Sequence, residues 1–304
     1  MTTTNKPTVV FEQYLTLTSN WLQKIIEPYL QLEQYTAHKT YDKKSTIFLT
    51  QYNQPLTTVA QQFRDDGYPI AYDNLSEAVT SDTIEHIIQT PNWFRYNESL
   101  RYSYHKHNTY RPNRTYKHLA LMPMRMRKPH RDLAQQQLQP WLNDFIWSYV
   151  DSGRQLPNDG NMLDWATQRH FHPDWYNDTC FSFVSETTVR LNNNVALISE
   201  KTYKPIAFYH PFLILGPMTT LKSLRSQGFE TFDNLFDESY DTEPSWVKRL
   251  NCLVNNVELY KKQPYDTETQ QKLIHNHELF FDTQLVTDCV VKEVVEPLLN
   301  CVKK

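Results

Sequence analysis

Apolar and polar positions in the first half of the chain alternate in a way that is typical of strands followed by helices. The apolar run 45–50 (STIFLT) predicts a buried strand. The amphipathic stretch 55–67 predicts a helix that ends at Gly67, because glycine takes the left-handed conformation after a helix without strain. By the same criteria we expect strands at 68–72, 118–124 and 144–150, and helices at 8–35, 81–90 and 130–141. This order favours a parallel sheet covered by helices.

The second half repeats this alternation and then becomes helical. We expect strands at 180–185 and 211–215, helices at 200–209 and 219–227, a helical stretch from Pro244, and a terminal helix at 267–303. The polar segment 151–161 (DSGRQLPNDGN) is rich in turn-forming residues and predicts a domain boundary. The sequence therefore predicts an α/β protein with two Rossmann-like domains, residues 1–155 and 156–304, and a helical C-terminal tail.

The segment 199–204 (SEKTYK) places charged residues at the start of a predicted helix. Ser199 suits the N-cap position, which puts Glu200 and Lys201 in the first turn. In doubly wound sheets ligands bind where strands end and helices begin, and a helix N-terminus attracts phosphate. Lys201 and Lys204 would add positive charge there, and Glu200 would accept hydrogen bonds from ribose or sugar hydroxyls. The alternative is that Glu200 only stabilises the helix dipole and that the lysines are solvated.

Two stretches around this segment, 181–188 (FSFVSETT) and 198–217 (ISEKTYKPIAFYHPFLILGP), resemble the C-terminal half of the fucosyltransferase and exostosin-like glycosyltransferases. Those families have a Phe-x-Phe-Glu-Asn-like strand, then a [Ser/Thr]-Glu-Lys motif, a helix and an apolar strand that ends in glycine. The counterparts here are Phe181, Phe183 and Glu186, then Ser199, Glu200 and Lys201, then the run 211–216. The strand motif departs from the pattern, because it reads Ser-Glu-Thr-Thr instead of Phe-Glu-Asn-Ser.

The resemblance covers residues 180–241 and implies a GT-B fold whose C-terminal domain holds a nucleotide-sugar donor, UDP- or GDP-linked, without a cofactor. It implies contact of Glu200 with the ribose and of Lys201 with the phosphates. With the neighbouring charges, the expected donor-binding residues are Glu186, Ser199, Glu200, Lys201 and Lys204. The segment 228–241 resembles virus-encoded relatives, although its acids also suit a turn that caps helices.

The stretch 93–131 is strongly basic, with ten lysines and arginines against one acid, Glu98, and tyrosines between them. One interpretation is that Arg125, Arg127 or Arg131 reaches the donor diphosphate through its planar fork of donors. A second is an acceptor surface for nucleic acid, with cations on phosphates and aromatic rings on bases. A third is a solvated surface whose tyrosines pack in the core.

An inverting GT-B enzyme needs a base for the acceptor hydroxyl and positive charge for the leaving diphosphate, but no metal. The candidate bases are Asp73, Glu98, His105 and His107. No Asp-x-Asp motif follows an apolar strand, so we expect no metal site. The acceptor would be a hydroxymethylated base in phage or viral DNA, or a glycan. The alternative function is a non-catalytic nucleotide- or nucleic-acid-binding protein that uses the stretch 93–131.

Composition narrows the remaining classes of function. Five glycines leave no glycine-rich phosphate loop, which excludes P-loop enzymes, kinases and Rossmann dehydrogenases. A net charge of −3 gives no overall basic field. Four cysteines without zinc-site spacing fit either reduced thiols or two disulfides. Neither a signal peptide nor a long apolar run is evident, so we expect a cytoplasmic protein, in the host cytoplasm if it is viral.

Overall fold

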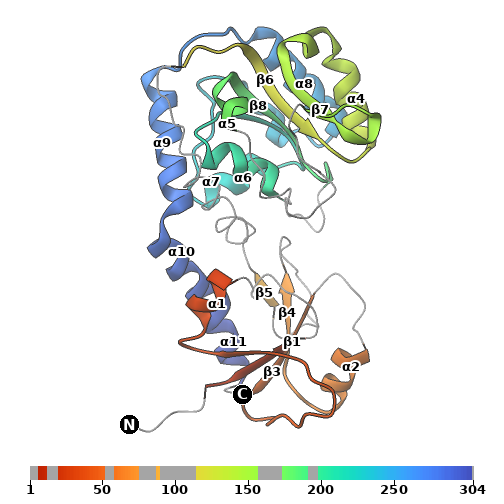
Figure 1. Cartoon of the computed structure of the whole chain (residues 1–304), viewed down its shortest axis with the longest axis vertical. Coiled ribbons are helices and arrows are strands. Elements are labelled where there is room, and N and C mark those ends of the chain that lie inside the picture. The colour runs from red at the N-terminus through yellow and green to blue at the C-terminus, as the bar shows by residue number, and fades with distance from the viewer. Residues whose placement is uncertain are drawn as a thin grey trace. The chain divides into compact units, whose positions relative to one another are not determined.

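The computed structural model describes residues 6–11, 20–51, 58–74, 87–89, 114–156, 173–190 and 198–302 (Figure 1). The chain forms two compact units: Met1–Arg95 with Asp282–Lys304, and Tyr96–Phe281. Each unit contains one parallel sheet with helices packed on it. This confirms the predicted α/β class with two Rossmann-like units.

The first unit contains a five-stranded sheet in the order β2-β1-β3-β4-β5, with every pair parallel. Its strands are β1 (Thr8–Phe11), β2 (Gln31–Gln34), β3 (Thr46–Gln51), β4 (Ile70–Asn74) and β5 (Ile87–Gln89). Its helices are α1 (Asn20–Ile26), α2 (Thr58–Asp65), α10 (Thr283–Val290), the π-helical turn η6 (Val291–Val295) and α11 (Glu296–Cys301). The C-terminal helices belong to this unit because α10 packs against α1, and η6 and α11 pack against β5.

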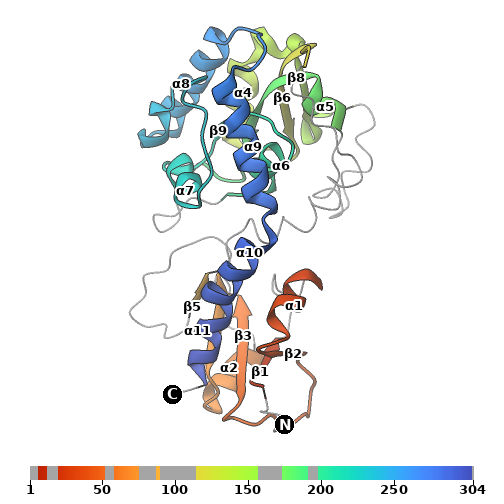
Figure 2. The same ribbon diagram turned by 90° about the vertical axis from the view of Figure 1, so that its left-hand side faces the viewer.

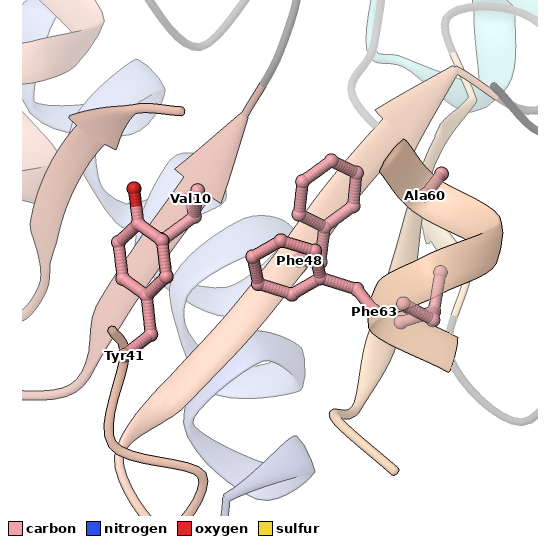
Figure 3. Packing of buried hydrophobic residues seen from close by; sticks show 6 residues of the cluster. Val10, Tyr41, Phe48, Ala60 and Phe63 are labelled. Carbon is pink, nitrogen blue, oxygen red and sulfur yellow. The ribbon is translucent and has the colours of Figure 1, made fainter. Parts of the chain in front are cut away.

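Aromatic side chains fill the core between the sheet and α2 (Figure 3). Phe48 occupies the middle of the sheet, where β3 pairs with β1 and β4. Ala60 and Phe63 lie three residues apart on one face of α2, and the Phe63 ring centroid is 4.4 Å from that of Phe48. The ring centroid of Tyr41 lies 5.6 Å from that of Phe63. Gly67 ends the helix segment with φ of 79°, as predicted.

Two predicted helices of this unit are wrong over the described residues. Thr8–Phe11 and Gln31–Gln34 are neighbouring strands, and only Asn20–Ile26 is helical in the predicted helix 8–35. The β-branched pair in β1 favours an extended backbone, and both of its side chains are buried against the sheet. In the predicted helix 81–90, Ile87–Gln89 pairs with β4 as a strand, and the rest lies outside the described residues.

The second unit contains a four-stranded parallel sheet in the order β7-β6-β8-β9. Its strands are β6 (His118–Met124), β7 (Phe145–Tyr149), β8 (Thr179–Ser185) and β9 (Phe212–Leu215). Its α-helices are α4 (Pro129–Gln137), α5 (Pro173–Asn177), α6 (Glu200–Ala207), α7 (Thr220–Ser226), α8 (Trp246–Leu259) and α9 (Thr267–Phe281), with short 3-10 helices at Gln139–Asp144, Val150–Ser152 and Ser239–Thr242. Every residue of β8 and β9 is buried, as expected for strands covered on both faces.

Helices of the second unit pack in pairs around this sheet. Helix α4 packs against α8, and α6 packs against α9, which crosses in front of it in Figure 2. Six predicted elements of this unit match its strands β6 to β9 and helices α6 and α7 to within two residues. Continuous apolar runs of this kind are typical of buried parallel strands, which explains why they were readily predicted.

The polar segment 151–161, predicted as the domain boundary, falls inside the second unit. The strands β6 and β7 precede this segment, but β6 pairs directly with β8, which follows it. The glycines, proline and aspartates therefore belong to a connection between β7 and β8. The two units meet in sequence at Arg95–Tyr96 and at Phe281–Asp282.

The predicted helix 267–303 is divided between the two units. Helix α9 ends at Phe281, and Asp282 begins α10 as its N-cap, with its carboxylate accepting a 2.9 Å hydrogen bond from the Leu285 N–H. All four cysteines are free, so the disulfide alternative is wrong. Across the parts of the chain that the structure describes, no helix has the length and apolar character needed to cross a membrane.

Candidate functional site

The strand order of the second unit creates a topological switch point. The chain passes from β6 to β7 on one side, and then to β8 on the other side of β6 (Figure 1). The connections that leave β6 and β8 therefore diverge, and ligands of doubly wound sheets bind at such points, beyond the carboxyl ends of the strands. The first unit has the same reversal between β1 and β3, but residues 12–19 and 52–57, which follow these strands, lie outside the described residues.

Glu186, the first residue after β8, holds the start of α6. One carboxylate oxygen accepts hydrogen bonds from the Ser199 N–H (3.0 Å) and the Thr202 hydroxyl (2.6 Å). The other accepts from the Ser199 hydroxyl and from the Thr187 N–H (3.2 Å). The carboxylate thus lies at the positive end of the helix dipole. Glu186 is 0% exposed, so it positions α6 and does not face a ligand, in contrast to the predicted donor contact.

Side chains that follow β6 bind three consecutive carbonyls at the end of β8, those of Ser185, Glu186 and Thr187. Arg131 donates to the Ser185 and Glu186 carbonyls at 3.1 Å, and also to the Met126 carbonyl. His130 donates from Nε2 to the Glu186 carbonyl at 3.0 Å, and Lys128 donates to the Thr187 carbonyl at 2.6 Å. Burial lowers the pKa of His130 to about 4, so the ring is neutral at pH 7. These contacts join the two connections across the switch point.

Arg131 was predicted to reach a diphosphate, but its guanidinium is only 2% exposed and is used by backbone carbonyls. Arg127 is exposed and pairs with Asp132 at 3.3 Å. The Arg125 carbonyl accepts from the Asp151 N–H, and the structure records no contact of its side chain with α6 among the described residues. The three arginines therefore do not converge on one point.

Lys128, Glu200 and Lys201 are half-buried at this edge of the sheet. Lys201 donates to the Glu200 carboxylate (2.7 Å), the Ser199 hydroxyl (3.1 Å) and the Thr187 hydroxyl (3.3 Å). Burial alone would raise the pKa of Glu200, but the charge and hydrogen bond of Lys201, with the charge of Lys204, lower it. Glu200 is therefore ionised at neutral pH. Burial, together with the nearby charges of Arg131 and Lys201, lowers the pKa of Lys128.

We call the residues that meet here the switch-point site: Lys128, Arg131, Glu186, Ser199, Glu200 and Lys201. With Lys204 and Asp151, which act electrostatically on Glu200 and Arg131, the site has four cations and three carboxylates. The excess of positive charge suits an anion. Among the described residues, no group of three or more histidines, cysteines or acids is arranged to hold a metal ion.

Lys128 is the member of the site that sequence reasoning missed. The diphosphate contact was predicted for the neighbouring arginines because of their planar fork of donors. Lys128 lies between them and immediately precedes Pro129, the first residue of α4. The available signal was a lysine between the end of a strand and the start of a helix, where ligands of such sheets bind. Of the candidate bases, Asp73 lies in β4 of the first unit, and Glu98, His105 and His107 lie outside the described residues.

The acids of the segment 228–241 cap turns, as one interpretation expected. Asp241 is buried and accepts from the Leu221 and Lys222 N–H groups at the start of α7. Glu238 accepts from the Phe232 N–H and pairs with Arg225. Their contacts are with the protein itself, so this segment is structural.

Comparison with protein-family models and with curated proteins gives no match. Among solved structures, a crystal structure of an alpha1,3-fucosyltransferase is similar with a TM-score of 0.45 and 10% identity, over 93% of this chain and 92% of that one. A crystal structure of alpha1,3-fucosyltransferase with GDP-fucose gives a TM-score of 0.44 and 9% identity, over 93% of both chains. Because both TM-scores lie below 0.5, this likeness assigns no activity, and the residues of the switch-point site carry the functional proposal instead.

Proposed function

We propose that the chain is a glycosyltransferase of the GT-B type that moves a sugar from a nucleotide-sugar to an acceptor hydroxyl. The observation that supports it is the convergence of an ionised Glu200 with Lys201 and Lys128 at a topological switch point. A nucleoside diphosphate-sugar carries two negative charges on its diphosphate and hydroxyls on its ribose. The excess of positive charge suits the diphosphate, and the Glu200 carboxylate suits the ribose hydroxyls.

The proposed reaction needs no metal and inverts the anomeric carbon. The acceptor oxygen forms a bond to that carbon while the carbon–oxygen bond to the diphosphate breaks, and the electron pair leaves with the diphosphate. A base takes the acceptor proton, and Asp73, Glu98, His105 and His107 remain the candidates for it. Lysines already in place stabilise the charge that grows on the leaving group.

For the acceptor we propose a hydroxymethylated base in phage or viral DNA or a glycan, met in the cytoplasm. The ten cations and interleaved tyrosines of the stretch 93–131 support the DNA acceptor, since cations bind phosphates and aromatic rings stack on bases. Sugar transfer can be assayed on both acceptor types with the same labelled donor. Label incorporated only into a glycan would remove the DNA acceptor from the proposal.

The first experiment is thermal unfolding in the presence of UDP, GDP, CMP and dTDP, with the wild type and a Glu200→Ala/Lys201→Ala variant. A nucleotide at 100 times its Kd should stabilise the protein by about 2.7 kcal/mol. We expect one nucleoside diphosphate to stabilise the wild type and not the variant. No stabilisation by any nucleotide would contradict the proposed function. Stabilisation without turnover of the matching nucleotide-sugars would favour a non-catalytic nucleotide-binding protein.

A further inference from the structure

The two lysines of the switch-point site meet at one residue, Thr187, but in different ways. Lys128 donates to the Thr187 backbone carbonyl at 2.6 Å, and Lys201 donates to the Thr187 hydroxyl at 3.3 Å. The two ammonium groups are close enough for the charge of Lys201 to contribute to the lowered pKa of Lys128. They come from different elements, one from the connection after β6 and one from the first turn of α6. The question is therefore which of them has donors left for an anion.

Counting donors separates the two lysines. An ammonium group has three N–H donors. Those of Lys201 have three acceptors, on Glu200, Ser199 and Thr187. Lys128 has one acceptor among the described residues, the Thr187 carbonyl, so two of its donors remain for another group. Arg131 is excluded because it is buried and bound to carbonyls.

The charged partners of the two lysines also indicate that Lys128, and not Lys201, is available for an anion. Lys201 is paired with the Glu200 carboxylate, and the buried Glu186 carboxylate favours the charge of Arg131. The structure records no carboxylate bonded to the Lys128 ammonium in the parts of the chain that it describes, and its charged neighbours are Arg131 and Lys201. A half-buried ammonium among cations is stabilised by an anion that binds beside it.

We infer that Lys128 binds the diphosphate of the donor, and that Lys201 is a positioning residue that holds the Glu200 carboxylate toward the nucleoside. This inference rests on the proposed function and assigns different roles to the two lysines. It also departs from the sequence expectation, which placed Lys201 on the phosphates. Lys201 bridges Glu200, Ser199 and Thr187, and so fixes the carboxylate relative to the end of β8.

Inorganic pyrophosphate tests the diphosphate contact without any contribution from base or ribose. Its Kd would be measured by isothermal titration calorimetry on the wild type, Lys128→Met, Lys201→Met and the control Lys117→Met. Lys117 immediately precedes β6, at the opposite end of the strand from Lys128, is 68% exposed and pairs with Asp178, so its replacement removes the same charge away from the site. Lys128→Met should weaken pyrophosphate binding about 10- to 100-fold, the usual effect of losing a charge-assisted hydrogen bond. The other two variants should stay within about threefold.

The positioning role of Lys201 has its own readout, the ratio of the Kd for pyrophosphate to the Kd for UDP, GDP or dTDP. In Lys201→Met this ratio should fall, because the nucleoside contact through Glu200 weakens while the diphosphate contact remains. Glu200→Gln should give the same fall. A general loss of structure would weaken both kinds of ligand together and leave the ratio unchanged.

Two further variants distinguish loss of binding from misfolding at position 128. Lys128→Gln keeps a donor for the Thr187 carbonyl without the charge, and Lys128→Arg keeps the charge, so only the second should retain pyrophosphate binding. Equal losses in Lys201→Met and Lys128→Met, or a Lys128→Gln variant that binds like the wild type, would overturn the inference and leave the proposed function standing. A wild type that binds neither pyrophosphate nor any of the three nucleotides would overturn the proposed function, and this inference with it.

Discussion

Replacement of Glu186 by glutamine tests whether a buried carboxylate holds the start of α6. The Ser199 N–H bonds to one carboxylate oxygen and the Thr187 N–H to the other, so the amide NH₂ of glutamine must face one of these donors. A buried donor left without a partner costs about 1–3 kcal/mol. Removing a negative charge from a helix N-terminus costs about 0.3–2 kcal/mol more. We therefore expect Glu186→Gln to lower the free energy of unfolding of the second unit by about 2–4 kcal/mol.

The matched control is Glu258→Gln, which removes an exposed carboxylate from α8 of the same unit. Thermal unfolding followed by circular dichroism should show a midpoint about 5–15 °C lower for Glu186→Gln. The control should change stability by no more than about 0.5 kcal/mol. Amide protons of the first turn of α6 should also exchange faster in Glu186→Gln, because their helix start is loosened. If the two variants melt together, the carboxylate does not hold α6, and the geometry of the switch-point site is explained wrongly.

Other predictions follow from single groups. The pKa of His130 is lowered from 6.5 to about 4, so the unfolded chain binds more protons than the folded chain between these values. The contribution of this histidine to stability therefore falls as pH drops through that range. In His130→Gln, the free energy of unfolding measured with urea should depend less on pH there. The lowered pKa of Glu200 contributes stability above its ordinary value of 4.5, and the gap between wild type and Glu200→Gln should close as pH falls below it. A Cβ at Gly216 would lie 3.0 Å from the Thr220 hydroxyl, which bonds to the Pro217 carbonyl, and 3.3 Å from Ile214 Cγ2. Gly216→Ala should therefore cost about 1–3 kcal/mol in denaturant unfolding. Truncation after Phe281 should unfold the first unit and leave the second protected from proteolysis, because α10, η6 and α11 pack on the first; equal cleavage of both units would contradict that division.

The strands of the second unit could be predicted from sequence because burial on both faces produces continuous apolar runs, as in Phe212–Leu215. The strand Thr8–Phe11 could not, because four residues beside a long amphipathic stretch fit a helical period as well. Its parallel pairing with β2 and β3, whose residues lie far along the chain, makes it a strand. The domain boundary failed for a related reason, since a turn-rich segment looks the same whether it joins two strands of one sheet or two units.

The site could be predicted in part for the same physical reasons. Ser199 as N-cap with Glu200 and Lys201 in the first turn is local information, and the structure places all three as expected. The role of Arg131 depends on carbonyls more than fifty residues away, and that of Glu186 on bonds to Ser199 and Thr202 beyond a connecting segment, and local patterns contain neither. An arginine in a basic stretch looks available for a ligand until its carbonyl partners are known.

Within the described residues no carboxylate pairs with Lys128, and stability does not explain this feature of the site. Partial burial of an ammonium among other cations costs free energy, which a carboxylate partner or full exposure would avoid. By contrast, Asp241 caps α7 and Lys272 pairs with Asp233 in the same unit. Local violations of this kind are expected where a sequence serves a ligand and not the fold. Lys128 lies where the connections after β6 and β8 diverge, which is the position where doubly wound sheets bind ligands. An anion that binds there best explains why a half-buried ammonium without a carboxylate partner is kept at this position.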